Sequence, residues 1–350
     1  MPVAIYVATL LVSGGLALAL TPVAIRLGER QGWVAVPGGR RKHKGRIPRI
    51  GGVPLYPAFA LAALLSLCVP TNDALEITRL QGVLLSLGVV WVMGFVDDVH
   101  ELPSWAQLLG LLAAAGVAIA FKVFIELFND PLTDQQIHVG WYVMVPLTLL
   151  WLVGTSSTVN LVDGLDGLAA GIAAIAALVL FVHMLRLGQY SVAVLPLALL
   201  GCCLGFLPYN FGGARIFLGG GAQLLGFALG ALSIVAGAKV ASALLVVWVP
   251  LVDAVWQVYW RWRSGRPIGI GDRGHLHMRL QDLGYPQVRI VLTYYAVTAV
   301  LGGVALWVSS RLLKLAVLAG VALVILAFLA VLARRGQDDV AGGSDAAGRP

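Results

Sequence analysis

The chain has 350 residues, of which 59% are hydrophobic and only 12% are charged, and its formal net charge is +7. Soluble domains average about 45–50% apolar and about 25% charged residues, so the composition excludes a soluble protein and indicates an integral membrane protein. It leaves no soluble basic domain, which excludes a nucleic-acid partner. The three cysteines, Cys68, Cys202 and Cys203, all lie in apolar runs and form neither a disulfide framework nor a zinc pattern.

Stretches of about 20 apolar residues are long enough to cross a membrane as helices. Eleven such stretches occur, with soft edges, over 3–25, 51–69, 81–97, 105–123, 142–159, 168–185, 191–209, 222–237, 240–260, 290–309 and 314–333. We therefore predict an all-α, polytopic fold with about 11 transmembrane helices in one integral membrane domain over 1–335. Residues 336–350 are predicted to be a disordered cytoplasmic tail, and 124–141 either a small hairpin or an interfacial helix.

Lys and Arg are distributed unequally between alternate loops. Most of the 24 fall in loop 26–50, loop 261–289 and the C-terminal tail, which share one side of the membrane if the spans alternate. Because basic loops stay in the cytoplasm, we predict that the N-terminus is outside and the C-terminus inside. The cytoplasmic side then also receives loops 97–104, 160–167 and 210–221.

The third predicted span ends in an adjacent pair of carboxylates, within Gly94-Phe95-Val96-Asp97-Asp98. A carboxylate deep in the bilayer costs about 2.5–3.5 kcal/mol on insertion scales, so a pair requires an explanation. Neighbouring helical residues point about 100° apart, so the two cannot form one symmetric chelate, but they could bridge a metal and a second ligand. The alternative is that both simply reach water at the interface.

A second acidic segment, Asn160-Leu161-Val162-Asp163-Gly164-Leu165-Asp166-Gly167, separates two apolar runs. Asn160 and Asp163 are three residues apart and would share a helical face, whereas Gly164 and Gly167 loosen the backbone and place Asp166 on a turn. An amide and carboxylates beside exposed backbone suit a polar heterocycle, a phosphate or a metal. A plain turn rich in Asp and Gly is the alternative.

The segment from Gly265 to Arg279 is basic, rich in glycine, and contains His275 and His277. Arg and His together suit an anionic phosphate; a basic cytoplasmic loop without a ligand is the alternative. Asp253 lies inside the ninth predicted span, where an ionisable residue is a functional hypothesis by default. A structural role with a satisfied partner explains Asp253 equally well.

Five segments, in this order, resemble the polyprenyl-phosphate N-acetylhexosamine-1-phosphate transferase family, which includes phospho-N-acetylmuramoyl-pentapeptide transferase among its relatives. They are His43-Lys44-Gly45-Arg46-Ile47-Pro48-Arg49-Ile50-Gly51-Gly52, Gly94–Asp98, Asn160–Gly167, Asn210…Phe217-Leu218-Gly219, and Asp272-Arg273-Gly274-His275-Leu276-His277. The resemblance covers roughly residues 1–335, and its wording is closer to the hexosamine branch than to the pentapeptide branch.

The resemblance implies a reaction in which undecaprenyl phosphate attacks a UDP-N-acetylhexosamine, giving polyprenyl-diphospho-N-acetylhexosamine and UMP. It implies Mg²⁺ as the cofactor, with Mn²⁺ as an alternative, a homodimer surrounded by membrane lipids, and multi-pass insertion in the inner (plasma) membrane with a cytoplasmic active site. The reaction would be the first membrane step of a cell-envelope glycan, such as a cell-wall polymer or a lipopolysaccharide. GlcNAc is the default sugar of this branch.

The resemblance also implies roles for individual residues. The implied catalytic residues are Asp97, Asp98, Asn160 and Asp163, and the implied metal ligands are Asp97, Asp98 and Asp163. The implied substrate-binding residues are Lys44, Asp166, Asn210, Phe217, Arg273, His275 and His277, with Phe217 stacking on the uracil and the histidines near the phosphates.

Two positions depart from the family pattern. Gly220 occupies the position of the metal-binding aspartate in Phe-Met-Gly-Asp-x-Gly-Ser, and Met278 that of the third histidine in His-x-His-His. One alternative is therefore a catalytically impaired member that binds lipid phosphate or UDP-sugar in a regulatory role. A transporter of an anionic solute is another, although it would place its ionisable residues near the midplane of the membrane.

Overall fold

The structure is a computed structural model, and it describes residues 2–35, 45–71, 73–129, 136–138, 140–237, 240–265 and 274–346. The first half of the chain forms α1 (Pro2–Gln31), α2 (Gly52–Ala63), the 3₁₀ helix η1 (Leu64–Cys68), α3 (Glu76–His100), α4 (Ser104–Ala120) and α5 (Trp141–Val162). The second half forms α6 (Leu168–Arg186), α7 (Val194–Asn210), α8 (Gly221–Val235), α9 (Val240–Arg263), α10 (Leu276–Asp282), α11 (Gln287–Trp307) and α12 (Arg311–Ala346).

The strands are short and form two antiparallel pairs. β1 (Val34–Ala35) pairs with β2 (Ile47–Pro48) next to the end of α1. β3 (Leu127–Asn129) pairs with β4 (Gln136–His138), so the hairpin alternative predicted within 124–141 is the correct one.

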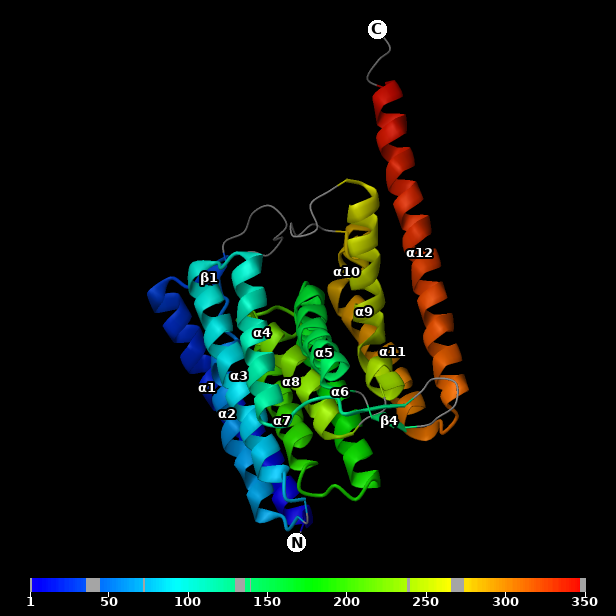
Figure 1. Cartoon of the computed structure of the whole chain (residues 1–350). Coiled ribbons are helices and arrows are strands. Elements are labelled where there is room, and N and C mark those ends of the chain that lie inside the picture. The colour runs from blue at the N-terminus through cyan, green and yellow to red at the C-terminus, as the bar shows by residue number, and fades with distance from the viewer. Residues whose placement is uncertain are drawn as a thin grey trace.

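Each predicted span coincides with a helix (Figure 1), the second one comprising both α2 and η1, and the prediction of an all-α polytopic membrane fold is confirmed. Among the described residues, α1, α3, α5, α6, α11 and α12 are long and apolar enough to cross a membrane, and the four shorter apolar helices are α2 with η1, α4, α7 and α8. Sequence analysis predicts no helix at α10, which lies inside the loop 261–289. The backbone of α12 extends to Ala346, and the tail predicted over 336–350 lies outside the described side chains.

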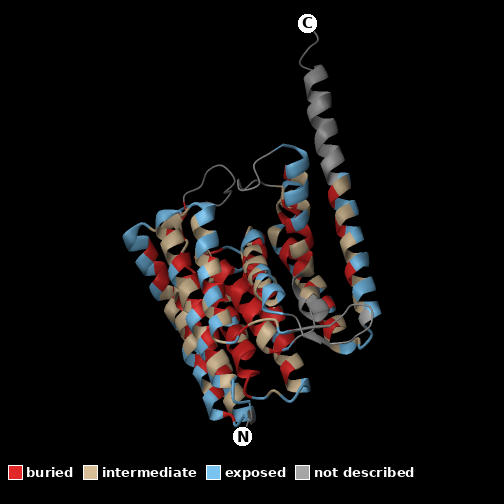
Figure 2. Ribbon diagram, viewed as in Figure 1, coloured by how far each residue is buried: buried red, intermediate tan, exposed pale blue. Residues whose placement is uncertain are grey.

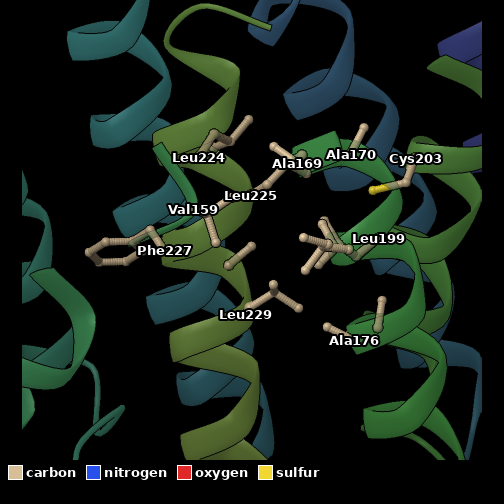
Figure 3. Packing of buried hydrophobic residues seen from close by; sticks show 14 of the residues in the cluster. Val159, Ala169, Ala170, Ala176, Leu199, Cys203, Leu224, Leu225, Phe227 and Leu229 are labelled. Atoms are coloured by element: carbon tan, nitrogen blue, oxygen red, sulfur yellow. The ribbon is translucent and has the colours of Figure 1, made fainter. Parts of the chain in front are cut away.

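The core lies between α6, α7 and α8, where buried residues are concentrated (Figure 2). Small residues on α6, such as Ala169 and Ala176, face Leu199 of α7 and Leu229 of α8 (Figure 3). Small side chains let helices approach closely, which replaces the hydrophobic driving force that lipid does not supply. Large apolar residues of α1 and α12 point outward instead, with Leu11 69% and Leu323 68% exposed, as expected of helices that face lipid.

Candidate active site

Helix α3 ends at the two adjacent carboxylates of Asp97 and Asp98. Glu101 adopts a left-handed conformation (φ 51°) just past the helix, and its backbone N–H donates to the carbonyl of Asp97. The Oδ1 of Asp97 accepts hydrogen bonds from the backbone N–H of Leu102 at 2.8 Å and from Nε2 of Gln107 at 2.9 Å. The chain that follows α3 therefore fixes the orientation of the Asp97 carboxylate.

Asp98 faces a different set of partners, as helical geometry predicts, and is only 4% exposed. Both of its oxygens accept a hydrogen bond from the backbone N–H of Gly220 at 3.0 Å, and Nε of Arg49 lies 3.7 Å from Oδ1. A Cβ added at Gly220 would lie 2.4 Å from the Cα of Gly94 on α3. The backbones of α3 and of the chain entering α8 thus approach so closely that only glycine fits at position 220.

Arg49 joins the basic segment near the N-terminus to this acidic pair. Besides its contact with Asp98, its Nη1 forms an ion pair with Glu101 at 2.6 Å. The segment is held by backbone bonds on either side of Arg49, because the N–H of Phe217 donates to the carbonyl of Pro48 at 2.8 Å. Sequence analysis gives Arg49 no role of its own, since headgroup anchoring alone explains a basic residue beside a membrane.

Asp163 follows the last residue of α5 as its C-cap. The helical face that it was expected to share with Asn160 therefore ends one residue short of it, and Asn160 itself is exposed. Burial raises the pKa of Asp163 to about 7, and the nearby charge of Asp166 acts in the same direction. The charge of Asp163 also acts on the carboxylate of Asp98, so the two acidic segments lie close enough to repel each other.

Asn210 ties the Asp-Gly turn to the loop after α7. It is 2% exposed; its Oδ1 accepts from the N–H of Gly167 at 3.0 Å, and its Nδ2 donates to the carbonyl of Ile216 at 2.9 Å. Nearby, Oδ2 of Asp166 accepts from the N–H of Ala214 at 3.0 Å. These bonds fix the turn relative to the loop, and the nucleotide contacts that the resemblance implies for Asp166 and Asn210 stay predictions.

Replacing Asn210 by alanine is expected to lower the free energy of unfolding by about 2–3 kcal/mol, because two buried backbone groups lose their partners. Thermal unfolding of the purified protein in detergent would measure this as a lower Tm. The exposed Asn160 provides the matched comparison: Asn160→Ala should leave Tm unchanged and, if Asn160 is catalytic, lower turnover. An unchanged Tm in Asn210→Ala would contradict the clamp role.

Helices α9 and α10 meet through Asp253, which is 1% exposed. Its Oδ2 lies 3.0 Å from Nδ1 of His275, and its Oδ1 accepts from the N–H of Leu276 at 3.0 Å. His275 is the N-cap of α10, so one carboxylate orients the histidine and satisfies the start of the helix. The ring of His277 stacks on that of His275 with centroids 5.7 Å apart and lies 4.0 Å from the same carboxylate.

Removing this carboxylate should release α10 from α9. Asp253→Ala is expected to cost about 2–3 kcal/mol of stability, because a buried histidine and a backbone N–H lose their acceptor together, whereas Asp253→Asn keeps one acceptor and should cost less. Chemical or thermal unfolding of both variants would test this ranking. Equal stabilities for the two variants and the unmodified chain would show that the cluster does not anchor α10.

The paired histidines reach the Asp163 turn. A Cβ added at Gly164 would lie within 2.2 Å of Nε2 of His277, so this fully buried ring rests on the backbone of the turn. In Figure 1, the ends of α3 and α9 lie at the same end of the bundle. Of the remaining predicted residues, Phe217 is half-buried beside the segment that carries Arg49, whereas Lys44 and Arg273 lie outside the described residues.

The donor set fits a divalent cation if substrate supplies part of the coordination. Among the described residues, no group of three His, Cys, Asp or Glu side chains is arranged to hold a metal ion by itself. Mg²⁺ is commonly bound through one or two carboxylates together with substrate phosphates. The raised pKa of Asp163 indicates a shortage of positive charge at this place, and a cation arriving with a phosphate would supply it. Asp97, Asp98 and Asp163 are the residues that would hold such a cation.

Comparisons with known proteins point to one kind of enzyme. The model of the family described as glycosyl transferase family 4 matches residues 80–237. The chain is 34% identical to the decaprenyl-phosphate N-acetylglucosaminephosphotransferase of Mycolicibacterium smegmatis, over 89% of this chain and 85% of that protein. It is 28% identical to the probable undecaprenyl-phosphate N-acetylglucosaminyl 1-phosphate transferase of Bacillus subtilis, over 83% of this chain and 84% of that one. It is also 30% identical to a phospho-N-acetylmuramoyl-pentapeptide-transferase of Nostoc, over 76% and 75% of the two chains.

Proposed function

This chain belongs to glycosyl transferase family 4, and on that basis we propose that it transfers an N-acetylhexosamine 1-phosphate from a UDP-sugar to undecaprenyl phosphate, releasing UMP. It is a phosphotransferase that acts on polyprenyl phosphate with a UDP-sugar. GlcNAc is the proposed sugar, because the N-acetylglucosamine enzymes of Bacillus subtilis and Mycolicibacterium smegmatis match this chain over most of its length.

The observation that carries the proposal is the meeting of separate polar segments at one end of the bundle. Asp98 contacts Gly220 and Arg49, the charge of Asp163 acts on Asp98, and His277 rests on the turn that follows Asp163. Carboxylates, a guanidinium and imidazoles are the groups that a reaction between two phosphates needs, because such a reaction depends on charge neutralisation and positioning. The arrangement therefore supports phosphoryl transfer at a membrane face.

In the proposed reaction, an oxygen of the lipid phosphate forms a bond to the sugar-linked phosphorus of the UDP-sugar. The bond from that phosphorus to the bridging oxygen breaks, and UMP leaves with the electron pair. A bound divalent cation would neutralise charge on the phosphates. Arg49 would orient and partly neutralise Asp98, while His275 and His277 would donate to phosphate oxygens as the reacting groups approach in line.

The carboxylates Asp97, Asp98 and Asp163 would position the lipid phosphate and its cation, Mg²⁺ or alternatively Mn²⁺. Lys44, Asp166, Asn210, Phe217 and Arg273 are the proposed nucleotide- and phosphate-side residues, and Asn160 belongs to the proposed catalytic centre. The reaction would open a cell-envelope glycan pathway on the cytoplasmic face of the inner membrane. A homodimer is the proposed assembly, by likeness to related enzymes.

The proposed orientation can be tested with a native cysteine. The segment formed by α2 and η1 runs from Gly52, which contacts the chain at Gly221, to the exposed Cys68 at the other end of the bundle. With the N-terminus outside, Cys68 faces the exterior, whereas Cys202 and Cys203 are buried. A membrane-impermeant maleimide should therefore label intact cells at Cys68, and Cys68→Ser should abolish the label. Labelling that requires broken cells would reverse the topology.

The function is tested by incubating the purified full-length protein in detergent with undecaprenyl phosphate, UDP-N-acetylhexosamine donors and titrated Mg²⁺. The expected result is stoichiometric release of UMP and formation of a lipid-linked sugar, which ceases when EDTA is added. Undecaprenol, which lacks the phosphate, is the matched control acceptor and should give no product. Binding of the UDP-sugar without turnover under all conditions would overturn the proposal and favour the regulatory alternative.

A further inference from the structure

Helix α4 places an amide against the first carboxylate of the acidic pair. Nε2 of Gln107 donates to Oδ1 of Asp97 at 2.9 Å and to the carbonyl of Leu102 at 3.0 Å. The backbone N–H of Leu102 donates to the same Oδ1. Within the described part of the chain, Oδ2 of Asp97 receives no hydrogen bond, so one oxygen is fixed and the other is left for a ligand.

A second amide continues the chain of hydrogen bonds into α8. Gln223 is 4% exposed, and its Nε2 donates to Oε1 of Gln107 at 2.9 Å. Its backbone carbonyl accepts from the hydroxyl of Ser156 on α5 at 2.9 Å. Its own Oε1 is buried and has no partner among the described residues. A buried amide that spends its donor on another side chain and leaves its acceptor open is expensive, which points to a role in the site.

The start of α8 therefore reaches both members of the acidic pair. Gly220 contacts Asp98 directly through its backbone N–H, and Gln223, three residues later, reaches Asp97 through Gln107. We propose that Gln107 and Gln223 are positioning residues, which hold Oδ1 of Asp97 and present Oδ2 to the lipid phosphate or to its cation. This inference rests on the transferase function proposed above.

The choice of amides is chemically meaningful. A Lys or Arg in the place of Gln107 would also hold Asp97, but it would neutralise the carboxylate and weaken its attraction for a cation. An amide donates a hydrogen bond and leaves the negative charge in place. Outer groups of this kind set the orientation of metal-binding carboxylates, and their loss commonly costs about 10–100-fold in metal affinity or activity.

The test uses the full-length protein with undecaprenyl phosphate and UDP-GlcNAc, and measures kcat, both KM values and the Mg²⁺ concentration for half-maximal rate. Gln107→Met removes the amide at similar volume, and it should lower kcat or raise the Mg²⁺ requirement by about 10–100-fold. Gln223→Met should have a smaller effect of the same kind. Because Gln223 acts through Gln107, the double variant should be no worse than Gln107→Met alone. Gln81→Met, an exposed glutamine near the other end of α3, is the matched control.

A second readout does not depend on turnover. The rise in Tm caused by added Mg²⁺ and undecaprenyl phosphate should be smaller in Gln107→Met than in the unmodified chain. Gln107→Glu, which keeps an acceptor for Gln223 but loses the donor to Asp97, carries the same expectation if the methionine variant does not fold. Wild-type kcat and Mg²⁺ dependence in Gln107→Met, or a lower Tm with unchanged kinetics, would overturn the positioning role. No turnover in the unmodified chain would instead overturn the proposed function.

Discussion

Asp98→Asn is expected to lower kcat by about 10³-fold while leaving the protein folded. The substitution keeps the shape of the side chain and an oxygen that can accept from the N–H of Gly220. It removes the negative charge that faces Arg49 and that would attract a cation to the substrate phosphates. Steady-state UMP release, beside Tm measured on the same preparation, would separate the chemical effect from any loss of structure.

The matched control is Asp73→Asn. Asp73 is exposed and pairs with Arg79 at 2.6 Å near the start of α3, at the far end of this helix from Asp98. Exposed ion pairs contribute about 0–1 kcal/mol, so this variant should keep both its Tm and its activity. Turnover within a few-fold of wild type in Asp98→Asn would remove this carboxylate from the catalytic centre.

Gly220→Asp is expected to unfold or severely destabilise the protein rather than to activate it, although aspartate is the residue that the family pattern places there. Its Cβ would collide with the backbone of Gly94, which no rotamer change relieves. The added carboxylate would also lie beside the buried Asp98. Overpacking and an uncompensated buried charge together predict a loss of about 4 kcal/mol or more. The fraction of monodisperse protein after detergent extraction and its Tm would report this loss.

Two alanine variants separate the causes. Gly220→Ala tests the collision without the charge and should be destabilised, though less than Gly220→Asp. In Gly154→Ala, on α5, the added methyl group meets nothing within 4 Å, so its Tm should match the wild type. A stable, more active Gly220→Asp would mean that α3 and α8 can separate to admit a metal-binding side chain.

The course of the helices could be predicted from sequence because long apolar runs have few alternatives in a membrane. Lipid offers no partners to exposed backbone, so each run becomes a helix. The short helix α10 could not be predicted, because Leu276–Asp282 is too brief to show a helical period within a basic loop. The hairpin of β3 and β4 was only one of two alternatives, since three-residue strands carry little signal.

The candidate site divides in the same way. Asp97, Asp98, Asp163 and the histidines stand out because charges are rare in this chain. Their mutual placement does not follow from composition, since the donor to Asp98 is the backbone N–H of Gly220, which leaves no mark in a side chain. Asp253 is conspicuous as a charge within an apolar run, yet only the structure identifies His275 as its partner. The amides of the proposed Asp97 relay were missed because isolated glutamines in apolar helices are not unusual.

The contact between Asp98 and Gly220 has an electrostatic consequence. Gly220 is the N-cap of α8, so the carboxylate lies at the positive pole of a helix dipole, where negative charge is favoured by about 0.3–1 kcal/mol at exposed sites and by more when partly buried. This field offsets part of the cost of burying the charge and, unlike the exposed pair between Arg49 and Glu101, is shielded from dissolved ions. The anionic centre of the protein is thus sustained by the peptide groups of a core helix, independently of the ionic strength of the cytoplasm.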